Sequence, residues 1–207
     1  MPSLELPSRF EPGPGADCRI LPWRCPELGY GVVLDAVLAR LRPRIRHAAA
    51  EQREAPRLIA ELLHLPQLRR ELLARNSDRY RNYFLSSLLL EVSDGVAETD
   101  CRQAEDLARC ALLILDRLDQ DWYGASNLED ARSRAWRRIA NARRAGGDFA
   151  GAEMAFARAE LHLRAGSGDP LERAQLLAVK AKLRQAQCRF VEAESLSRRA
   201  TRLAARG

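Results

Sequence analysis

Residues 136–159 read WRRIANARRAGGDFAGAEMAFARA, and this segment predicts two helices joined by a tight turn. Apolar side chains recur three and four residues apart on either side of the turn, which is the spacing of one face of an α-helix. Gly146 and Gly147 favour the end of the first helix, and Asp148 favours the start of the second. Small residues stand where the two helices would face each other, and they allow a close approach: Ala140, Ala152 and Ala159.

The same two-helix pattern recurs elsewhere in the chain. One copy begins 41 residues after Trp136 and keeps the internal spacings, with Leu177, Lys180, Ala181, Phe190, Ala193, Ser197 and Ala200. A looser copy begins 48 residues before Trp136, with Leu88, Val92, Ala104, Ala108 and Ala111. Three related units in succession predict about three antiparallel helix hairpins over residues 77–207.

Two capping patterns mark helix starts in this region. Asn127 is followed three residues later by Asp130, and Asp169 is followed by a proline at the first helical position and by Glu172. Aspartate and asparagine caps accept hydrogen bonds from the free N–H groups of a first turn, and proline suits its first position. The patterns therefore predict helices that begin near 127 and near 169.

The remainder of the chain also favours helix. No sustained alternation of polar and apolar residues appears and β-branched residues are scarce, so no strand is expected. Prolines divide the N-terminal helical segment, residues 31–76, because proline breaks a helix interior; the expected helices are 32–41, 44–54, 57–65 and 67–75. Residues 1–30, which hold six of the ten prolines, are expected to form a proline- and glycine-rich leader.

The unit over 136–159 resembles the tetratricopeptide repeat. Its residues occupy the positions that this family fills with a tryptophan, a leucine, small residues and aromatics: Trp136, Ile139, Ala140, Phe149, Ala152, Phe156 and Ala159. Phe190, Ala193 and Ala200 take the corresponding core positions in the next unit. Arg143 and Arg164 depart from the family pattern. The resemblance implies an all-α fold of antiparallel hairpins stacked as a short right-handed solenoid, as in divergent bacterial arrays of regulatory or scaffold type.

In such repeats the first helices line a concave groove, and the resemblance implies which residues face it here: Arg134, Arg137, Asn141, Arg144, Gln175, Lys182 and Gln185. Arg137 and Asn141 resemble part of the clamp by which some tetratricopeptide domains hold a carboxylate. Residues 131–207 hold 17 bases and 7 acids, whereas residues 91–130 hold 11 acids and 3 bases. A basic groove beside an acidic region favours an acidic partner segment, and the alternative is that the arginines form only a solvated face.

These observations predict a non-enzymatic protein-binding module or adaptor. The alternative is nucleic-acid binding, because 34 basic residues against 28 acidic ones give the required electrostatic footprint. The low aromatic content, 6% of the chain, leaves few side chains to stack on bases and favours the protein partner. The last expected helix carries an apolar stripe that includes Leu196 and Leu203, so a homodimer through the C-terminal helix is a further expectation.

No motif in the sequence indicates catalysis, a metal or a cofactor. His47, His64 and His162 are isolated, and Cys18 and Cys25 have too many residues between them for a tight zinc pair. A third interpretation places an unrecognised enzymatic site in residues 31–75, but the arginines there alternate around the helix and favour a solvated surface. No signal peptide or membrane span is evident, so a cytoplasmic location is expected.

Overall fold

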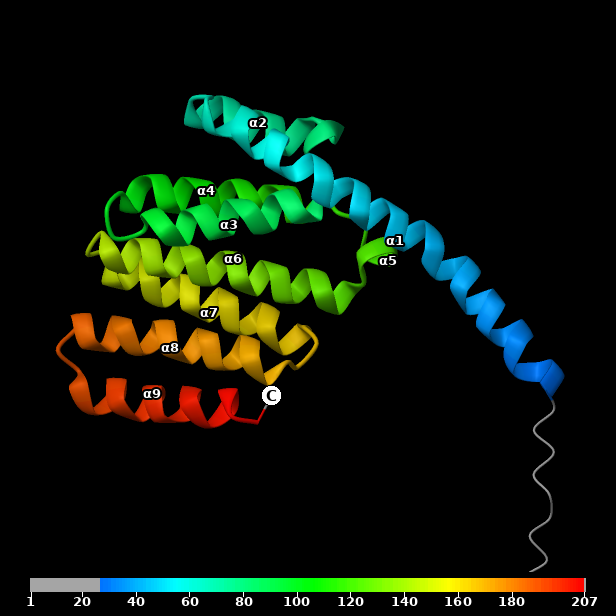
Figure 1. Cartoon of the computed structure of the whole chain (residues 1–207). Coiled ribbons are helices and arrows are strands. Elements are labelled where there is room, and N and C mark those ends of the chain that lie inside the picture. The colour runs from blue at the N-terminus through cyan, green and yellow to red at the C-terminus, as the bar shows by residue number, and fades with distance from the viewer. Residues whose placement is uncertain (1–26, 207) are drawn as a thin grey trace, which may run out of the picture. The chain divides into compact units, whose positions relative to one another are not determined.

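The computed structural model describes residues 27–206 of the chain, and every α-helix or 3₁₀ turn in that range is shown in Figure 1. The helices are α1 (Glu27–Leu63), α2 (Gln67–Asn76), α3 (Tyr83–Val96), α4 (Cys101–Leu115), α5 (Gln120–Tyr123), α6 (Ala125–Ala145), α7 (Phe149–Ala165), α8 (Pro170–Ala186) and α9 (Phe190–Ala204). A 3₁₀ turn, Asp78–Tyr80, precedes α3. No strand occurs in residues 27–206, which confirms the all-α prediction. Most of the predicted leader, residues 1–26, and the pair Cys18 and Cys25 lie outside the described residues.

Caps set the starts of the longer helices, as the sequence predicts. Asp148 accepts a hydrogen bond from the Gly151 N–H at the start of α7, and Asp169 accepts one from the Leu171 N–H at the start of α8. Gly147 follows α6 with a φ of +80°, a left-handed conformation that favours glycine. The predicted helix ends at Gly146-Gly147 and starts at Asp148 and Asp169 are confirmed.

The start of α6 differs from the prediction at Asn127. The helix begins at Ala125, and the short helix α5 precedes it. Gly124 joins the two with a φ of +86°. Because a single left-handed glycine turns the chain there, the helix begins two residues earlier than the Asn127 pattern indicates.

The interruption predicted at Pro43 and Pro56 is wrong, because α1 runs through both prolines. Each proline removes one backbone hydrogen bond and crowds the preceding turn. Both are exposed, so that the ring lies on the outer face of the helix. The buried face next to Pro56 packs in the core: Ala55, Leu58 and Leu62. Tertiary packing of that face outweighs the local cost of the proline there.

The chain divides into two compact units between Arg42 and Pro43. The described part of the first unit, residues 27–42, is helical throughout. In the second unit, consecutive helices pack as the pairs α3–α4, α6–α7 and α8–α9, while α4 also packs on α6, and α8 on α6 and α7 (Figure 1). Residues 43–76, predicted as part of a separate N-terminal segment, belong to the same unit as these pairs.

Helices α6 and α7 form an antiparallel pair, as predicted. Near one end of the pair the Ser133 hydroxyl donates to the carbonyl of Ala159 over 2.9 Å. At the other end Arg143 Nη1 donates to the carbonyl of Gly151 over 3.2 Å. The N-terminal part of one helix therefore lies beside the C-terminal part of the other.

The repeat-core residues divide between the interior and its edge. Those of the α6–α7 pair are buried or pack against the core, with Trp136 and Phe149 partly exposed: Trp136, Ile139, Ala140, Phe149, Ala152, Phe156 and Ala159. Ala193 and Ala200 are buried on α9. Phe190 is 65% exposed, so its predicted place in the core is wrong. It is the first residue of α9, which packs chiefly on α8, and within residues 27–206 its side chain is left largely uncovered.

Two carboxylates at helix junctions make the stability depend on pH. Burial opposes the ionisation of Glu105, but hydrogen bonds and charge from Arg143 and Arg109 more than offset it and hold its pKa below 4.5. Burial likewise opposes the ionisation of Glu153, and Arg184 more than offsets it, so the pKa of Glu153 also lies below 4.5. A depressed pKa stabilises the folded chain above the unfolded value, and this contribution is lost as the pH falls through the folded value.

We therefore expect the Tm to fall as the pH drops from about 5 to about 3. In the double variant Glu105→Gln/Glu153→Gln this decline should be shallower, because neither position can then take up a proton. Thermal unfolding followed by circular dichroism at several pH values measures it. Glu54→Gln, at an exposed position that forms no ion pair in the described part of the chain, is the matched control. An equally steep decline in the double variant would contradict this assignment.

Candidate functional site

Side chains from three helices meet around a cavity of about 210 Å³. Its lining comes from α3, α6 and α8: Ser87, Leu90, Glu91, Arg134, Arg137, Arg138, Glu172 and Gln175. We call this the α3–α6–α8 surface. Three of the predicted groove residues, Arg134, Arg137 and Gln175, line it together, and the first helix of each pair contributes to it.

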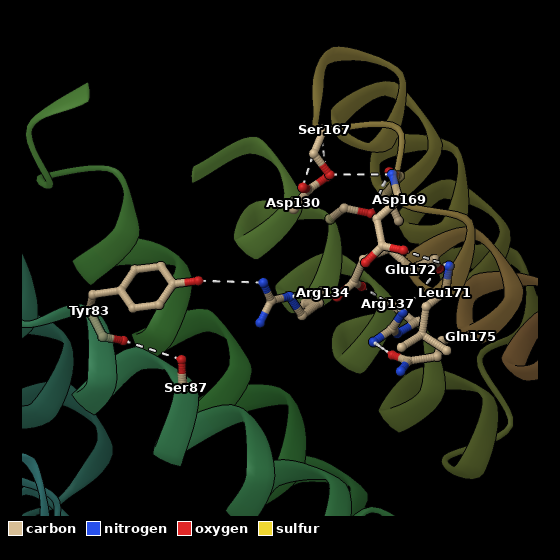
Figure 2. Close-up of polar contacts among 12 residues, drawn as sticks. Tyr83, Ser87, Asp130, Arg134, Arg137, Ser167, Asp169, Leu171, Glu172 and Gln175 are labelled. Atoms are coloured by element: carbon tan, nitrogen blue, oxygen red, sulfur yellow. Dashed lines mark hydrogen bonds and ion pairs between the residues drawn. The ribbon is translucent and has the colours of Figure 1, made fainter. Parts of the chain in front are cut away.

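The loop before α8 places Glu172 at this surface. Buried Asp130 on α6 accepts hydrogen bonds from the Ser167 N–H at 3.2 and 3.1 Å, and the Ser167 hydroxyl accepts one from the Asp169 N–H at 3.3 Å (Figure 2). A Cβ at Gly166 would stand 1.9 Å from the Asp130 carboxylate, so glycine is needed for this close approach. Asp169 then caps α8, and Glu172 follows in its first turn.

Glu172 is shared between two guanidinium groups. Arg134 Nε lies 3.1 Å from Glu172 Oε1, and Arg137 Nη1 lies 3.3 Å from Oε2. Arg137 Nη2 also donates to Gln175 Oε1 over 2.7 Å (Figure 2). The two arginines exceed Glu172 by one positive charge, and the exposed carboxylate of Glu91, which lines the same cavity, adds a negative charge to this surface.

Arg137 is almost wholly enclosed, with 3% of its surface exposed. Burial lowers the pKa of its guanidinium to about 10, and the nearby charge of Glu172 opposes that shift. The group therefore stays charged at neutral pH. Its Nε is buried and has no hydrogen-bond partner among the described residues. A charged donor in this setting is stabilised by any further acceptor that reaches it.

Arg134 also connects the surface to α3. Its Nη2 donates to the Tyr83 hydroxyl over 3.4 Å, and Figure 2 shows the tyrosine ring extending toward it. The Arg134 side chain is 33% exposed, so its guanidinium remains accessible from solvent. It is the arginine of this surface that an incoming ligand can reach with the least rearrangement.

The remaining predicted groove residues lie away from the cavity. Arg144 pairs with Glu98 and donates to Asn141, whose own side chain is buried. Lys182 and Gln185 are exposed on α8, and neither lines the cavity. Acids from residues 91–130 thus balance part of the basic charge of α6, and Arg138 is paired in the same way with Asp94.

Sequence reasoning missed Glu172 and Arg138 as members of this surface, and Tyr83 as the hydrogen-bond partner of Arg134. The sequence pattern explained Glu172 as part of the capping of α8, and it gave no indication that the side chain contacts arginines on α6. Tyr83 and Arg138 carried no signal in the sequence, because only the packing of α3 on α6 brings Tyr83 to Arg134 and Arg138 to Asp94. A pairing of arginines and acids between successive first helices would have been the signal to look for.

In residues 27–206 no group of three His, Cys, Asp or Glu side chains is placed to hold a metal ion. Cys101, Cys110 and Cys188 are free thiols. Across the same residues, the helices lack the combination of length and apolar character required to span a bilayer.

In comparisons with protein-family models, with curated proteins and with solved structures, no match to the chain was found. The resemblance to tetratricopeptide repeats therefore remains a prediction from the sequence pattern.

Proposed function

We propose that the chain is a non-enzymatic protein-binding module, a short right-handed tetratricopeptide-like solenoid whose α3–α6–α8 surface takes up an acidic segment of a partner protein. One observation carries this proposal. Arg134 and Arg137 share a single carboxylate, while the buried Nε of Arg137 lacks an acceptor among the described residues.

The surface is suited to a carboxylate for reasons of charge and geometry. Guanidinium groups bind carboxylates through two parallel hydrogen bonds, and these are stronger than bonds between neutral groups. Arg137 is already held by Glu172 and Gln175, so little side-chain freedom remains to be lost on binding. Arg134, whose side chain is 33% exposed, is the arginine that the partner's carboxylate would contact first.

A nucleic acid is a poorer fit to this surface. A nucleic acid needs an extended row of cations along its phosphates, whereas this surface offers three arginines, which are also paired with Glu172 and Asp94. Tyr83 is partly buried and stacks on Tyr123 with ring centroids 5.9 Å apart. The Tyr83 ring, whose hydroxyl accepts a hydrogen bond from Arg134, is thus engaged in packing and not free to stack on a base.

The test compares two charge reversals in the full chain. A partner is first recovered from an extract of the native cells and identified, and its affinity is then measured by calorimetry. Arg134→Glu should weaken binding by more than about tenfold, because it places a carboxylate where the partner's carboxylate would lie. Lys182→Glu, a reversal on exposed α8 outside the cavity, should change it less than about twofold.

Circular dichroism must show that both variants melt close to the parent chain. Equal affinity of Arg134→Glu and the parent would remove the α3–α6–α8 surface from the proposal. Recovery of nuclease-sensitive nucleic acid in place of a protein would favour the alternative function. A second copy of the chain as the recovered species would point to the homodimer.

A further inference from the structure

A second cavity, of about 400 Å³, lies between α7, α8 and α9. Leucines form its apolar lining, with Leu176 and Leu177 buried and the other two half-buried: Leu163, Leu176, Leu177 and Leu196. Charged residues surround them: Glu160, Arg164, Asp169, Arg173, Lys180 and Arg199. We call this the α7–α9 groove. It is separate from the α3–α6–α8 surface, because α8 turns Glu172 and Gln175 to one and Arg173, Leu176 and Leu177 to the other.

Three of the four cations that line the α7–α9 groove are free of ion pairs within residues 27–206. Arg164, Arg173 and Arg199 are exposed and form no ion pair with any residue in the described part of the chain. Lys180 is held by Glu160 over 2.6 Å, so these two charges cancel. The Asp169 carboxylate is occupied as the cap of α8. The groove therefore keeps an excess of positive charge around an apolar floor.

We propose that the α7–α9 groove docks an acidic amphipathic helix of a partner protein, with its apolar face on the leucines and its carboxylates beside the three unpaired arginines. An amphipathic helix presents apolar residues at a spacing of three and four with polar residues on both sides, which matches a leucine floor between charged edges. Charge complementarity selects the acidic kind. This inference goes beyond the proposed function, because it concerns a different surface and a second ligand.

The acids of this same chain are poor occupants. Five of the eleven acids in the chain's acidic region, residues 91–130, already form ion pairs within the unit: Asp94, Glu98, Glu105, Asp116 and Glu129. Docking of a second copy through these residues would break existing pairs. The apolar stripe on α9 that is predicted to form a dimer is also partly unavailable, because Ala193 and Ala200 on this helix are already buried within the chain.

Nucleic acid fits the groove less well than a helix does. Phosphates would use the arginines but gain nothing from four leucines, and none of the residues lining the cavity is aromatic. Binding that depends on both the leucines and the arginines is the distinguishing property of the proposed occupant.

The probe is a synthetic, fluorescently labelled peptide of about four helical turns, with leucine at positions i, i+3, i+4 and i+7 and glutamate on the flanks. One control peptide replaces the leucines by serine, and another replaces the glutamates by lysine. Fluorescence anisotropy with the full chain measures affinity. The variant Arg173→Glu/Arg199→Glu reverses two of the three unpaired charges. Arg102→Glu is the control at an exposed arginine on α4 that forms no ion pair in residues 27–206.

We expect the acidic leucine peptide to bind, and both control peptides to bind more than about tenfold more weakly. The double reversal should lose about tenfold in affinity, whereas Arg102→Glu and Arg134→Glu should stay within about twofold. Equal binding of the serine peptide, no effect of the double reversal, or tighter binding of single-stranded DNA or anionic vesicles would each overturn the proposal. Because Arg134 lies outside this groove, failure here leaves the α3–α6–α8 surface untouched, and the converse also holds.

Discussion

Replacement of Phe156 by alanine is expected to lower the free energy of unfolding by about 4 kcal/mol, because it leaves a cavity in the centre of the α6–α7 pair. The phenyl ring is 0% exposed and heads the fully buried side chains of the described residues by volume. Rigid neighbours on two packed helices relax only partly into the vacated space. Urea denaturation followed by circular dichroism provides the measurement.

Met154→Ala is the matched control on the same helix. The Met154 side chain is 63% exposed, so its truncation should change the free energy of unfolding by less than about 1 kcal/mol. A Phe156→Ala variant as stable as Met154→Ala would mean that α6 and α7 do not enclose the phenyl ring. The comparison therefore tests the packing that the small residues Ala140, Ala152 and Ala159 allow.

Replacement of Glu172 by leucine is expected to destabilise the chain by about 3 kcal/mol, because it leaves the Arg137 guanidinium charged, enclosed and without its acid. Glu172 and Arg137 are mostly buried, with 13% and 4% of their side chains exposed. The substitution lowers the free energy of unfolding, so urea denaturation measures its effect as well.

The double variant Arg137→Met/Glu172→Leu distinguishes the loss of the ion pair from the loss of side-chain packing at these positions. It removes both charges, and apolar side chains of similar size then fill the space, so stability should return to within about 1 kcal/mol of the parent chain. If the double variant were less stable than Glu172→Leu alone, the ion pair would not be the source of the loss. Arg134 keeps access to water in either variant.

The sequence predicts the local part of this fold well. The α6–α7 hairpin, its glycine turn and the caps Asp148 and Asp169 follow from residues close together in the chain, and the structure confirms them. Such features depend on backbone hydrogen bonds over a few residues, which short patterns specify. The all-α class follows for the same reason, because no segment shows the alternation of polar and apolar residues that a strand requires, and many show the spacing of a helix.

Predictions failed where distant residues decide the outcome. The continuation of α1 through Pro56 depends on the packing of Ala55, Leu58 and Leu62, and local proline chemistry gives no sign of it. The exposure of Phe190 depends on what lies beyond α9. The resemblance placed Arg137 on the groove wall, and it does line the cavity, but no pattern in the sequence indicated that Glu172 reaches it from α8 or that it is 3% exposed.

Helix α8 lines both cavities of the unit, with Glu172 and Gln175 on one side and Arg173, Leu176 and Leu177 on the other. A helix moves largely as a rigid body, so a displacement that tightens one side changes the spacing on the other. If one occupant displaces α8, the two sides are linked thermodynamically, and each occupant then changes the affinity for the other by the same factor. The coupling is positive if both occupants favour the same position of α8, and negative if they favour different positions.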